Sequence, residues 1–319
     1  MKFSAALSIS STLMRVLLSN DDGVEAPGLW ALYQEISKIA EVLVVAPSTE
    51  RSAVGHAISV YNEVTLRRHI REQTEWGYGL DGTPADCVKM ALTVLMKDNP
   101  PDLVISGINR GQNTGTSILY SGTVAAALEA TMFGFPAIAV SLAVVAPFKG
   151  EKLASFQPGS THFGDEAHKL ARTAPEYATA AKHAARLANV VAKHGLPKGV
   201  LLNVNVPCLP EDQIKGIAIS KMGHSLFVDE FKVMSECNGD VCYRNVGDRL
   251  IQSPDGEDWD DLVLNKGKVS ITPLHYDLTH HEFAEQLKKW ALEEERITRE
   301  VSEEVARELS AELNAEIGQ

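Results

Sequence analysis

The chain alternates short, continuous apolar runs with stretches typical of amphipathic helices, and this alternation constrains its fold more than any other feature. Four apolar runs predict buried strands, at residues 15–19, 41–46, 102–106 and 137–142. Helical stretches lie between them, at residues 27–39, 84–96 and 122–133. Continuous apolar strands are buried on both faces, which is typical of a parallel sheet covered by helices.

The predicted fold class is therefore α/β, a Rossmann-like, mostly parallel sheet with helices on both faces. Val, Thr and Tyr in residues 54–80 predict extra strands, and a helix at 176–194 precedes a further strand at 200–206. Residues 215–270 contain many turn residues and predict a β-hairpin excursion outside the sheet core. Three regions follow: a frayed or disordered extension at 1–13, the main α/β domain at 14–281, and an acidic, helical C-terminal extension at 282–319.

Composition excludes some partners. The formal net charge of -12 argues against broad adhesion to a nucleic acid duplex, which needs clustered Lys and Arg to displace counterions. No apolar run is long enough to span a bilayer, so no membrane partner is expected. Residues 1–13 lack a convincing secretory core, and a cytoplasmic location is the corresponding expectation.

The four cysteines contain no CxxC pair, so structural zinc is not expected. Cys237 and Cys242 flank a turn signal at residues 238–240, which would let them face each other across a hairpin. A disulfide between them is not favoured in a chain with no export signal.

A pair of adjacent aspartates follows the first predicted strand, in Asn20-Asp21-Asp22-Gly23. Adjacent carboxylates repel each other unless a cation neutralises them, and divalent ions such as Mg²⁺ and Mn²⁺ prefer oxygen ligands. The same residues are also ordinary turn composition, so the motif alone fits a solvated turn equally well. Its position after a buried strand favours a metal site, because ligands bind beyond the carboxyl ends of strands in open α/β sheets.

Polar loops follow the second and third strands as well. Ser52 offers a neutral oxygen to a metal, and His56 is the one histidine expected near the site. In residues 106–115, three glycines let the backbone approach a ligand, and Asn109 offers an amide oxygen. Ser121-Gly122-Thr123 opens a helix, whose N-terminus favours an anion. Together these loops predict a phosphate site that has neither a Walker nor a dinucleotide motif.

These segments, taken in order, resemble the motifs of the SurE family, the stationary-phase survival proteins that act as metal-dependent 5'-nucleotidases. The resemblance covers about residues 14–281 and rests on VLLSNDDGVEAPG, VVAPSTERSAVGHAIS, GTPADCV, SGINRGQNTGTSILYSGTVAAALEA and ITPLHYDLTH. One departure is Thr116-Ser117, which stands in a stretch where family members commonly carry an acidic residue.

The resemblance implies one divalent ion per subunit, Mg²⁺ or Mn²⁺, and two sets of ligands. The implied metal ligands are Asp21, Asp22, Ser52 and Asn109. The implied phosphate ligands are Gly111, Asn113, Ser121, Gly122 and Thr123. It further implies nucleoside 5'-monophosphates as substrates, with 3'-monophosphates and short polyphosphate as secondary ones. Homodimers or homotetramers joined by exchanged β-hairpins and C-terminal elements are the implied assemblies.

The expected reaction is metal-dependent phosphomonoester hydrolysis with Asp21 as general base, and with Asn20 and Asn113 as the other catalytic residues. Two alternatives stay open. Asp21 would form a covalent aspartyl-phosphate in the first, although phosphatases of that kind use Asp-x-Asp rather than adjacent aspartates. The second is a non-catalytic module that binds a nucleotide or phosphate tightly without turnover.

Overall fold

The computed structural model describes residues 13–71, 74–143, 174–246, 250–254, 258–288, 290, 302–305 and 307. The chain forms two compact units, Met1–Tyr276 and Asp277–Gln319. Of the predicted C-terminal helix, the described residues include α7 (His281–Leu287) and the helical residues 302–305 and 307. Residues 289, 291–301, 306 and 308–319 of that predicted helix, and residues 1–12 of the predicted N-terminal extension, lie outside the described residues.

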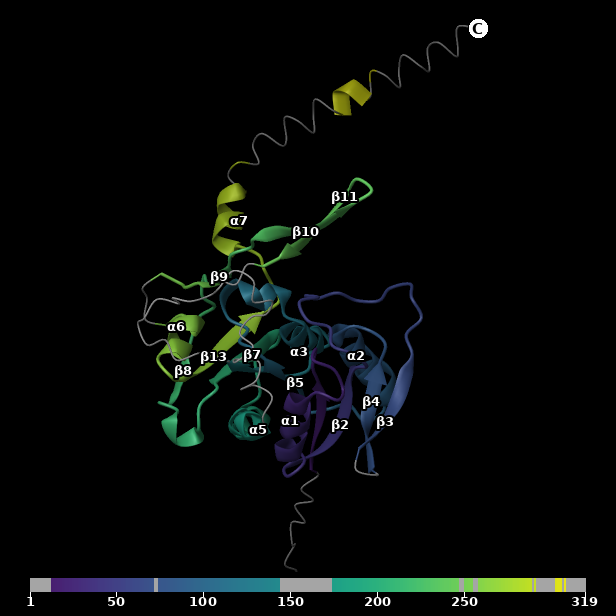
Figure 1. Ribbon diagram of the computed structural model, residues 1–319, viewed down its shortest axis with the longest axis vertical. Helices are drawn as coiled ribbons and strands as arrows, with labels where there is room; N and C mark the ends of the chain where they lie inside the picture. The colour runs from purple at the N-terminus through teal and green to yellow at the C-terminus, as the bar shows by residue number, and fades with distance from the viewer. Residues whose placement is uncertain are drawn as a thin grey trace, which may run out of the picture. The chain divides into compact units, whose positions relative to one another are not determined.

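The described part of the first unit is built on a nine-stranded sheet with the order β3-β4-β2-β1-β5-β6-β7-β13-β8 (Figure 1). Its strands are β1 (Met14–Ser19), β2 (Ala40–Pro47), β3 (Leu66–Arg71), β4 (Thr74–Leu80), β5 (Leu103–Arg110), β6 (Ala137–Ala143), β7 (Val200–Pro207), β8 (Ile217–Ile219) and β13 (Val269–His275). The strands from β4 to β7 are parallel, whereas β3 and β13 are antiparallel to β4 and β7. The predicted α/β class with a mostly parallel sheet is confirmed.

Strand β1 lies where the strand order reverses. Val16 pairs with Val42 of β2 on one side and with Leu103 of β5 on the other. From β1 the chain adds β2 and β4 in one direction, then returns to add β5, β6 and β7 in the other. A crevice forms beyond the carboxyl ends of the strands at such a switch point, and ligands of open α/β sheets bind there. The sheet order therefore directs attention to the loops that follow β1, β2 and β5.

Helices cover both faces of the sheet (Figure 1). One face carries α1 (Pro27–Ile36) and α5 (Ala174–His194), and the other carries α2 (Pro84–Met90), the π-helical turn η1 (Ala91–Leu95) and α3 (Gly122–Met132). Val16 and Leu18 of β1 join the first apolar core, and Leu17 between them joins the second, because successive side chains of a strand point to opposite faces. Burial of each such leucine contributes about 2 kcal/mol to stability.

Strand β5 continues four residues beyond the predicted strand end at Ser106, so the expectation that a loop begins there was wrong. Ser106 pairs with Ala139 of β6, and the next pair is Asn109 with Ser141. Three steps along β5 thus correspond to two along β6, which is the geometry of a β-bulge. In the sequence, Gly107 indicated the start of a loop. In the structure it lies within the bulge, so Asn109 remains part of the strand.

The segment at residues 215–270 is only partly the excursion that was predicted. A separate antiparallel hairpin is present, made of β10 (Phe231–Cys237) and β11 (Asp240–Asn245), and β9 (Leu226–Phe227) pairs with β12 (Leu250–Ile251). The expectation that the segment adds no sheet core was wrong, because β8 and the start of β13 belong to the main sheet. The short helices η3 (Glu211–Gln213) and α6 (Asp260–Asn265) lie before and within it.

The hairpin register separates the two cysteines that flank its turn. Cys237 lies opposite Asp240, and Cys242 lies opposite Ser235. Both thiols are free and exposed. The two cysteines are therefore not cross-strand partners. No helix among the described residues is both long and apolar enough to cross a membrane.

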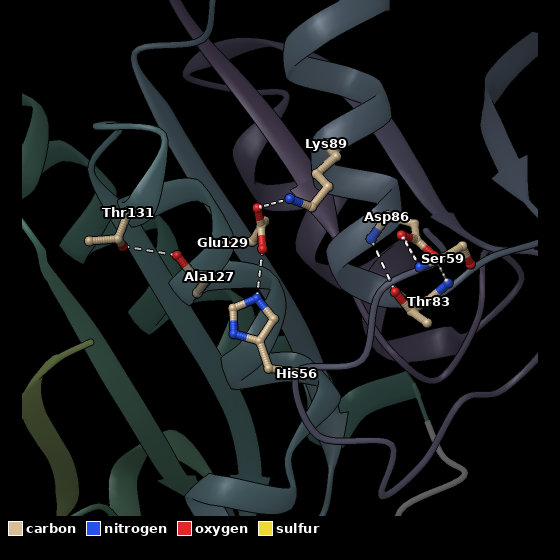
Figure 2. A network of polar contacts seen from close by, with 8 residues as sticks. All are labelled: His56, Ser59, Thr83, Asp86, Lys89, Ala127, Glu129 and Thr131. Carbon is tan, nitrogen blue, oxygen red and sulfur yellow. Dashed lines mark hydrogen bonds and ion pairs between the residues drawn. The ribbon is translucent and has the colours of Figure 1, made fainter. Parts of the chain in front are cut away.

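Asp86 joins α2 to the long loop that follows β2 (Figure 2). Thr83 caps the helix by accepting the Asp86 N–H at 3.1 Å, and its own N–H donates to Asp86 Oδ2 at 2.9 Å. The N–H and hydroxyl of Ser59 donate to the same carboxylate at 2.9 and 2.8 Å. Burial raises the pKa of Asp86, but these hydrogen bonds from Thr83 and Ser59 outweigh it, so the pKa lies below its ordinary value.

Replacement of Asp86 by Asn should lower the free energy of unfolding by about 2 kcal/mol at pH 7, since hydrogen bonds to a charged acceptor are lost. A carboxyl group with a lowered folded-state pKa stabilises the fold above its unfolded pKa and loses that contribution as the pH falls through the folded value. The difference between wild type and Asp86→Asn should therefore shrink from pH 5 to about pH 3. Urea denaturation across this range measures it.

Ser59→Ala is the matched control, because it removes one of the three hydrogen bonds that the Asp86 carboxylate accepts and keeps the carboxylate. Its effect should be less than half that of Asp86→Asn. A gap between wild type and Asp86→Asn that widens as the pH falls would contradict the assignment.

Candidate active site

Asn20 closes the turn that follows β1. Its side-chain nitrogen donates to the carbonyl oxygen of Gly23 at 2.9 Å, and its Oδ1 accepts the Gly23 N–H at 3.2 Å. The side chain is fully buried, so the turn is held from inside the protein. These contacts shape the loop that carries Asp21 and Asp22, and the catalytic part expected of Asn20 stays a prediction.

Asp21 lies at the switch point and is 4% exposed. The Thr123 hydroxyl donates a short hydrogen bond to its Oδ1, and the Arg51 N–H donates to its main-chain oxygen at 2.7 Å. Burial raises the pKa of Asp21, although the hydrogen bond from Thr123 acts in the opposite direction. Asp21 thus connects the loop after β1 to the loop after β2 and to the first turn of α3.

Asp22 accepts the Arg110 N–H on its Oδ2 at 3.1 Å, which ties it to the end of β5. Burial and, to a lesser extent, the negative charge of Asp21 together raise the pKa of Asp22 to about 7. Two adjacent, desolvated carboxylates are costly to keep ionised, and a divalent cation is the partner that removes this cost. The aspartate pair therefore fits the expected metal ion.

The other expected metal ligands are neutral. No group of three His, Cys, Asp or Glu among the described residues is arranged to hold an ion, so a site here needs the oxygens of Ser52 and Asn109. Asn109 donates its side-chain nitrogen to the Gly111 carbonyl at 2.8 Å, which leaves the amide oxygen as the atom that would bind a metal. The Ser52 hydroxyl donates to Glu50 at 2.7 Å.

Glu50 and Arg110 are charged neighbours of the site that the sequence analysis missed. The Glu50 charge adds to the repulsion that raises the pKa of both Asp21 and Asp22. Arg110 Nη2 lies 4.0 Å from Glu50 Oε1, and the Glu50 side chain is 53% exposed. In the sequence, Glu50 lies two residues before Ser52 and Arg110 directly follows Asn109. This closeness to predicted ligands was the feature that could have indicated them.

Asn113 is buried in a network of amides. Its N–H donates to Asn205 at 2.8 Å, and its carbonyl oxygen accepts from Asn203 and Asn205 at 2.8 and 3.0 Å. Its own side-chain nitrogen donates to the Ser141 hydroxyl at 2.9 Å. One side-chain N–H remains for a phosphate oxygen, so the predicted phosphate contact stays a prediction. The sequence analysis did not connect Asn203 and Asn205 of β7 with this loop.

The first turn of α3 packs directly on Asp21. Ser121 caps the helix by accepting the Val124 N–H at 3.1 Å, and Thr123 is fully buried against the carboxylate. A Cβ atom on Gly122 would lie 2.8 Å from Asp21 Cβ and 3.1 Å from Asp21 Oδ2, so only glycine lets the helix come this close. Gly111 has a φ of +114°, which favours glycine where the loop leaves β5. Among the predicted phosphate ligands, the structure brings the 121–123 turn against the aspartates.

Asp260 of α6 holds the loop that follows β5. Its carboxylate accepts the Gly115 N–H at 3.0 Å and the Gly223 N–H at 2.9 Å, and the residue is fully buried. Thr116 donates its hydroxyl to the Ser225 carbonyl at 2.8 Å, so the turn η2 (Gly115–Tyr120) is fastened at two points. Asp260, the acidic residue beside this loop, lies 145 residues from Gly115 in the sequence, so no local sequence pattern indicated the contact.

His56 was expected near the site, and its observed partner lies on α3. Its ring Nε2 is 2.6 Å from Glu129 Oε2, and Lys89 of α2 binds the other Glu129 oxygen at 2.7 Å (Figure 2). The main chain next to it is anchored as well, because the Gly55 N–H donates to the Tyr120 carbonyl at 3.0 Å. His56 therefore contacts the helix that packs on Asp21.

Comparison with known proteins gives matches over most of the chain. Residues 16–229 match the family model described as "Survival protein SurE". A protein of Syntrophobacter fumaroxidans named 5'-nucleotidase SurE is 41% identical over 88% of this chain and 100% of its own length. A protein of the same name from Carboxydothermus hydrogenoformans is 40% identical over 87% of this chain and 96% of its own length.

A solved structure leads to the same family. The crystal structure of the SurE protein from Aquifex aeolicus is 31% identical and covers 86% of this chain and 99% of its own length, with a TM-score of 0.66. The matched residues include the loops after β1, β2 and β5 and the start of α3. This chain therefore belongs to the SurE family.

Proposed function

We propose that this chain hydrolyses nucleoside 5'-monophosphates to nucleoside and phosphate in a metal-dependent reaction. The observation that carries the proposal is the pair of adjacent carboxylates at the switch point, in which Asp21 is buried against the N-terminus of α3 and Asp22 is half-buried. Carboxylates attract a cation and the helix N-terminus attracts an anion, so the site suits a phosphate bound through a metal ion. The 5'-nucleotidase names of relatives about 40% identical over most of the chain support this reaction.

The site takes one divalent ion per subunit, Mg²⁺ or Mn²⁺, with Asp21, Asp22, Ser52 and Asn109 as ligands. When bound, the ion supplies positive charge for the phosphate and lowers the pKa of water. Ser52 changes partner in this proposal, since its hydroxyl now donates to Glu50. Ser52 directly follows Arg51, whose N–H donates to the Asp21 main-chain oxygen, and this bond supports a position of Ser52 near the aspartates.

The phosphate lies at the start of α3 in this proposal. Free N–H groups of the first helical turn and the helix dipole favour negative charge there. The Ser121 oxygen accepts from Val124, which leaves its hydroxyl proton for a phosphate oxygen. Gly111 and one N–H of Asn113 contribute from the loop after β5. These donors stabilise the charge that develops on the transferred phosphoryl group.

Asp21 acts as the general base. The Thr123 hydroxyl donates to Oδ1, so Oδ2 carries both roles proposed for Asp21, with one lone pair for the ion and the other for the proton of the attacking water. Burial raises the pKa of Asp21 above its ordinary value, which makes the carboxylate a stronger base. Full turnover by Asp21→Asn with the metal still bound would rule out this part of the mechanism.

The two alternatives have less support. The Thr123 hydroxyl donates to Asp21, and the Arg110 N–H donates to Asp22. This arrangement suits two carboxylates that bind one ion together better than a mechanism in which one aspartate is the nucleophile and the other the general acid. Trapping of a phosphoenzyme after acid quench would favour the covalent route. Tight nucleotide binding without turnover would favour a binding module. Activity on 3'-monophosphates and short polyphosphate, and the cytoplasmic location, stay predictions.

Removal and return of the metal is the first test. Phosphate release from nucleoside monophosphates should disappear after treatment with EDTA and return with Mg²⁺ or Mn²⁺. Asp22→Asn keeps an oxygen for the Arg110 N–H but removes the charge, so it should lower phosphate release at least 100-fold at pH 8. Without metal the variant should melt about 3 °C above wild type, because the buried repulsion is relieved.

Asp98→Asn is the matched control, since Asp98 is exposed and lies beyond η1. Its activity and its melting temperature should equal those of wild type. Folded, metal-loaded wild type that releases no phosphate from any nucleoside monophosphate would overturn the proposed function.

Gly122→Ala tests the close approach of α3 to Asp21. The added methyl group would displace Asp21 or the helix start, so kcat/KM should fall at least 10-fold. Gly195→Ala is the control, because Gly195 has a φ of +70° and nothing within 4 Å of an added Cβ. That control should lower stability by about 1 kcal/mol through backbone strain and leave kcat/KM unchanged. Equal losses of activity in both variants would contradict the packing argument.

We also infer that the β10–β11 hairpin joins copies of the chain into a homodimer or homotetramer. Val233 and Tyr243 are cross-strand partners, 51% and 60% exposed, and Phe231 is 64% exposed. Apolar side chains of this size on an exposed hairpin favour a protein partner. The family resemblance implies that this protein partner is a second copy of the chain.

Paired charge substitutions test the hairpin. Val233→Lys with Tyr243→Lys should shift the mass measured by light scattering from the oligomer toward the monomer, because desolvating two charges opposes association. Lys232→Glu with Arg244→Glu alters the neighbouring cross-strand pair and should leave the mass unchanged. A monomeric wild type would refute the inference.

A further inference from the structure

The long loop between β2 and β3 carries Ser52 and contains no helix or strand over residues 48–65. Hydrogen bonds tie it to the body of the protein at intervals. Ser48 N–H donates to Leu80 O at 2.8 Å, and Arg51 N–H donates to Asp21 O at 2.7 Å. Beyond Ser52, the loop is held by Gly55, His56 and Ser59. The position of Ser52 therefore depends on anchors to either side of it.

Glu129 of α3 is the buried end of one anchor. Its side chain is 3% exposed, and its two carboxylate oxygens bind His56 Nε2 at 2.6 Å and Lys89 Nζ at 2.7 Å (Figure 2). Burial raises the pKa of Glu129, but the bonds from His56 and Lys89 outweigh it and lower the pKa below its ordinary value. The carboxylate is thus a charged, fixed point inside the protein.

The two partners of Glu129 come from different parts of the fold. Lys89 belongs to α2, which packs on α3, so this ion pair joins two helices that are already in contact. His56 belongs to the loop, so its bond joins a segment without regular structure to a helix. Lys89 already pairs with the negative charge of Glu129. The bond between His56 and Glu129 therefore serves mainly to connect the loop to α3. The side chain of His56 is 29% exposed, and the contact between Lys89 and Glu129 that joins the two helices does not involve it.

Helix α3 also holds the aspartate pair. Thr123 in its first turn donates to Asp21, and Tyr120 just before it accepts the Gly55 N–H. The loop and the aspartates are therefore both positioned by one helix, through Glu129 for the loop and through Thr123 for Asp21. A shift of the loop along α3 would move Ser52 relative to Asp21.

We propose that Glu129 and His56 are positioning residues, whose contact fastens the loop to α3 and sets the distance of Ser52 from the Asp21-Asp22 pair. The inference rests on the proposed function, in which Ser52 is a metal ligand. Without the His56 contact, the Arg51–Asp21 bond still holds the start of the loop, and Ser52 becomes free to move away. The consequence falls on metal binding, while the phosphate ligands at the start of α3 remain in place.

Metal affinity, measured by calorimetry with Mn²⁺ alone, tests the proposal in the full chain. His56→Ala should weaken Mn²⁺ binding about 10-fold and lower kcat at subsaturating Mn²⁺. KM for the nucleotide at saturating Mn²⁺ should change less than 2-fold. His56→Gln should restore most of the affinity, since the Gln side-chain nitrogen takes the place of Nε2 as a donor to Glu129. Amide hydrogen exchange in residues 49–58 should be faster in His56→Ala than in wild type.

Lys89→Met is the matched control, because it breaks the other bond to the same carboxylate and leaves the loop attached. It should lower the melting temperature at least as much as His56→Ala and keep the wild-type affinity for Mn²⁺. Wild-type affinity and exchange in His56→Ala would overturn the proposal, and so would an equal loss of affinity in Lys89→Met. Mn²⁺ binding by a wild type that hydrolyses no nucleotide would overturn the proposed function alone, since the affinities still test the anchor.

Discussion

Burial of two adjacent carboxylates is the constraint on which the rest of this structure depends. Asp21 and Asp22 follow β1 at the switch point, where the surrounding sheet and helices exclude water and raise the pKa of both groups. The fold offsets part of this cost with one donor for each carboxylate, the Thr123 hydroxyl and the Arg110 N–H. The remaining cost favours a cation, so the destabilising feature of the chain is also the basis of its proposed chemistry.

Most of the sheet was predictable because β1, β2 and β6 are continuous apolar runs and turn residues follow β1 and β2. The end of β5 was not, since a glycine that begins a loop and a glycine inside a bulge look alike in a sequence. Strand β8 is three residues long with Ile217 and Ile219 exposed, and it owes its place in the sheet to pairing with β13. Local patterns carry no information about such long-range pairing.

Some residues of the candidate site could likewise be predicted from the sequence, and others could not. Asp21, Asp22 and the turn that contains Thr123 were predictable, because each follows a buried strand or opens a helix and carries a side chain with evident chemistry. Asp260 was not, since it lies 145 residues from the Gly115 N–H that it binds. The amides of Asn203 and Asn205 lie on a buried strand, where a polar side chain has meaning only once its partner Asn113 is known.

A helix holds its residues at more constant positions than the loops that carry the proposed metal ligands. The main-chain bonds and buried face of α3 hold Thr123 and Glu129 at a fixed spacing, whereas the loop with Ser52 is exposed and moves unless it is tied. Divalent ions bind tightly only when their ligands are held in place before binding. A hydrogen bond between His56 and a buried carboxylate of this helix gives the loop such support away from the proposed reacting atoms. In the proposed site, residues well removed from the phosphate would thereby take part in determining how firmly the ion is held.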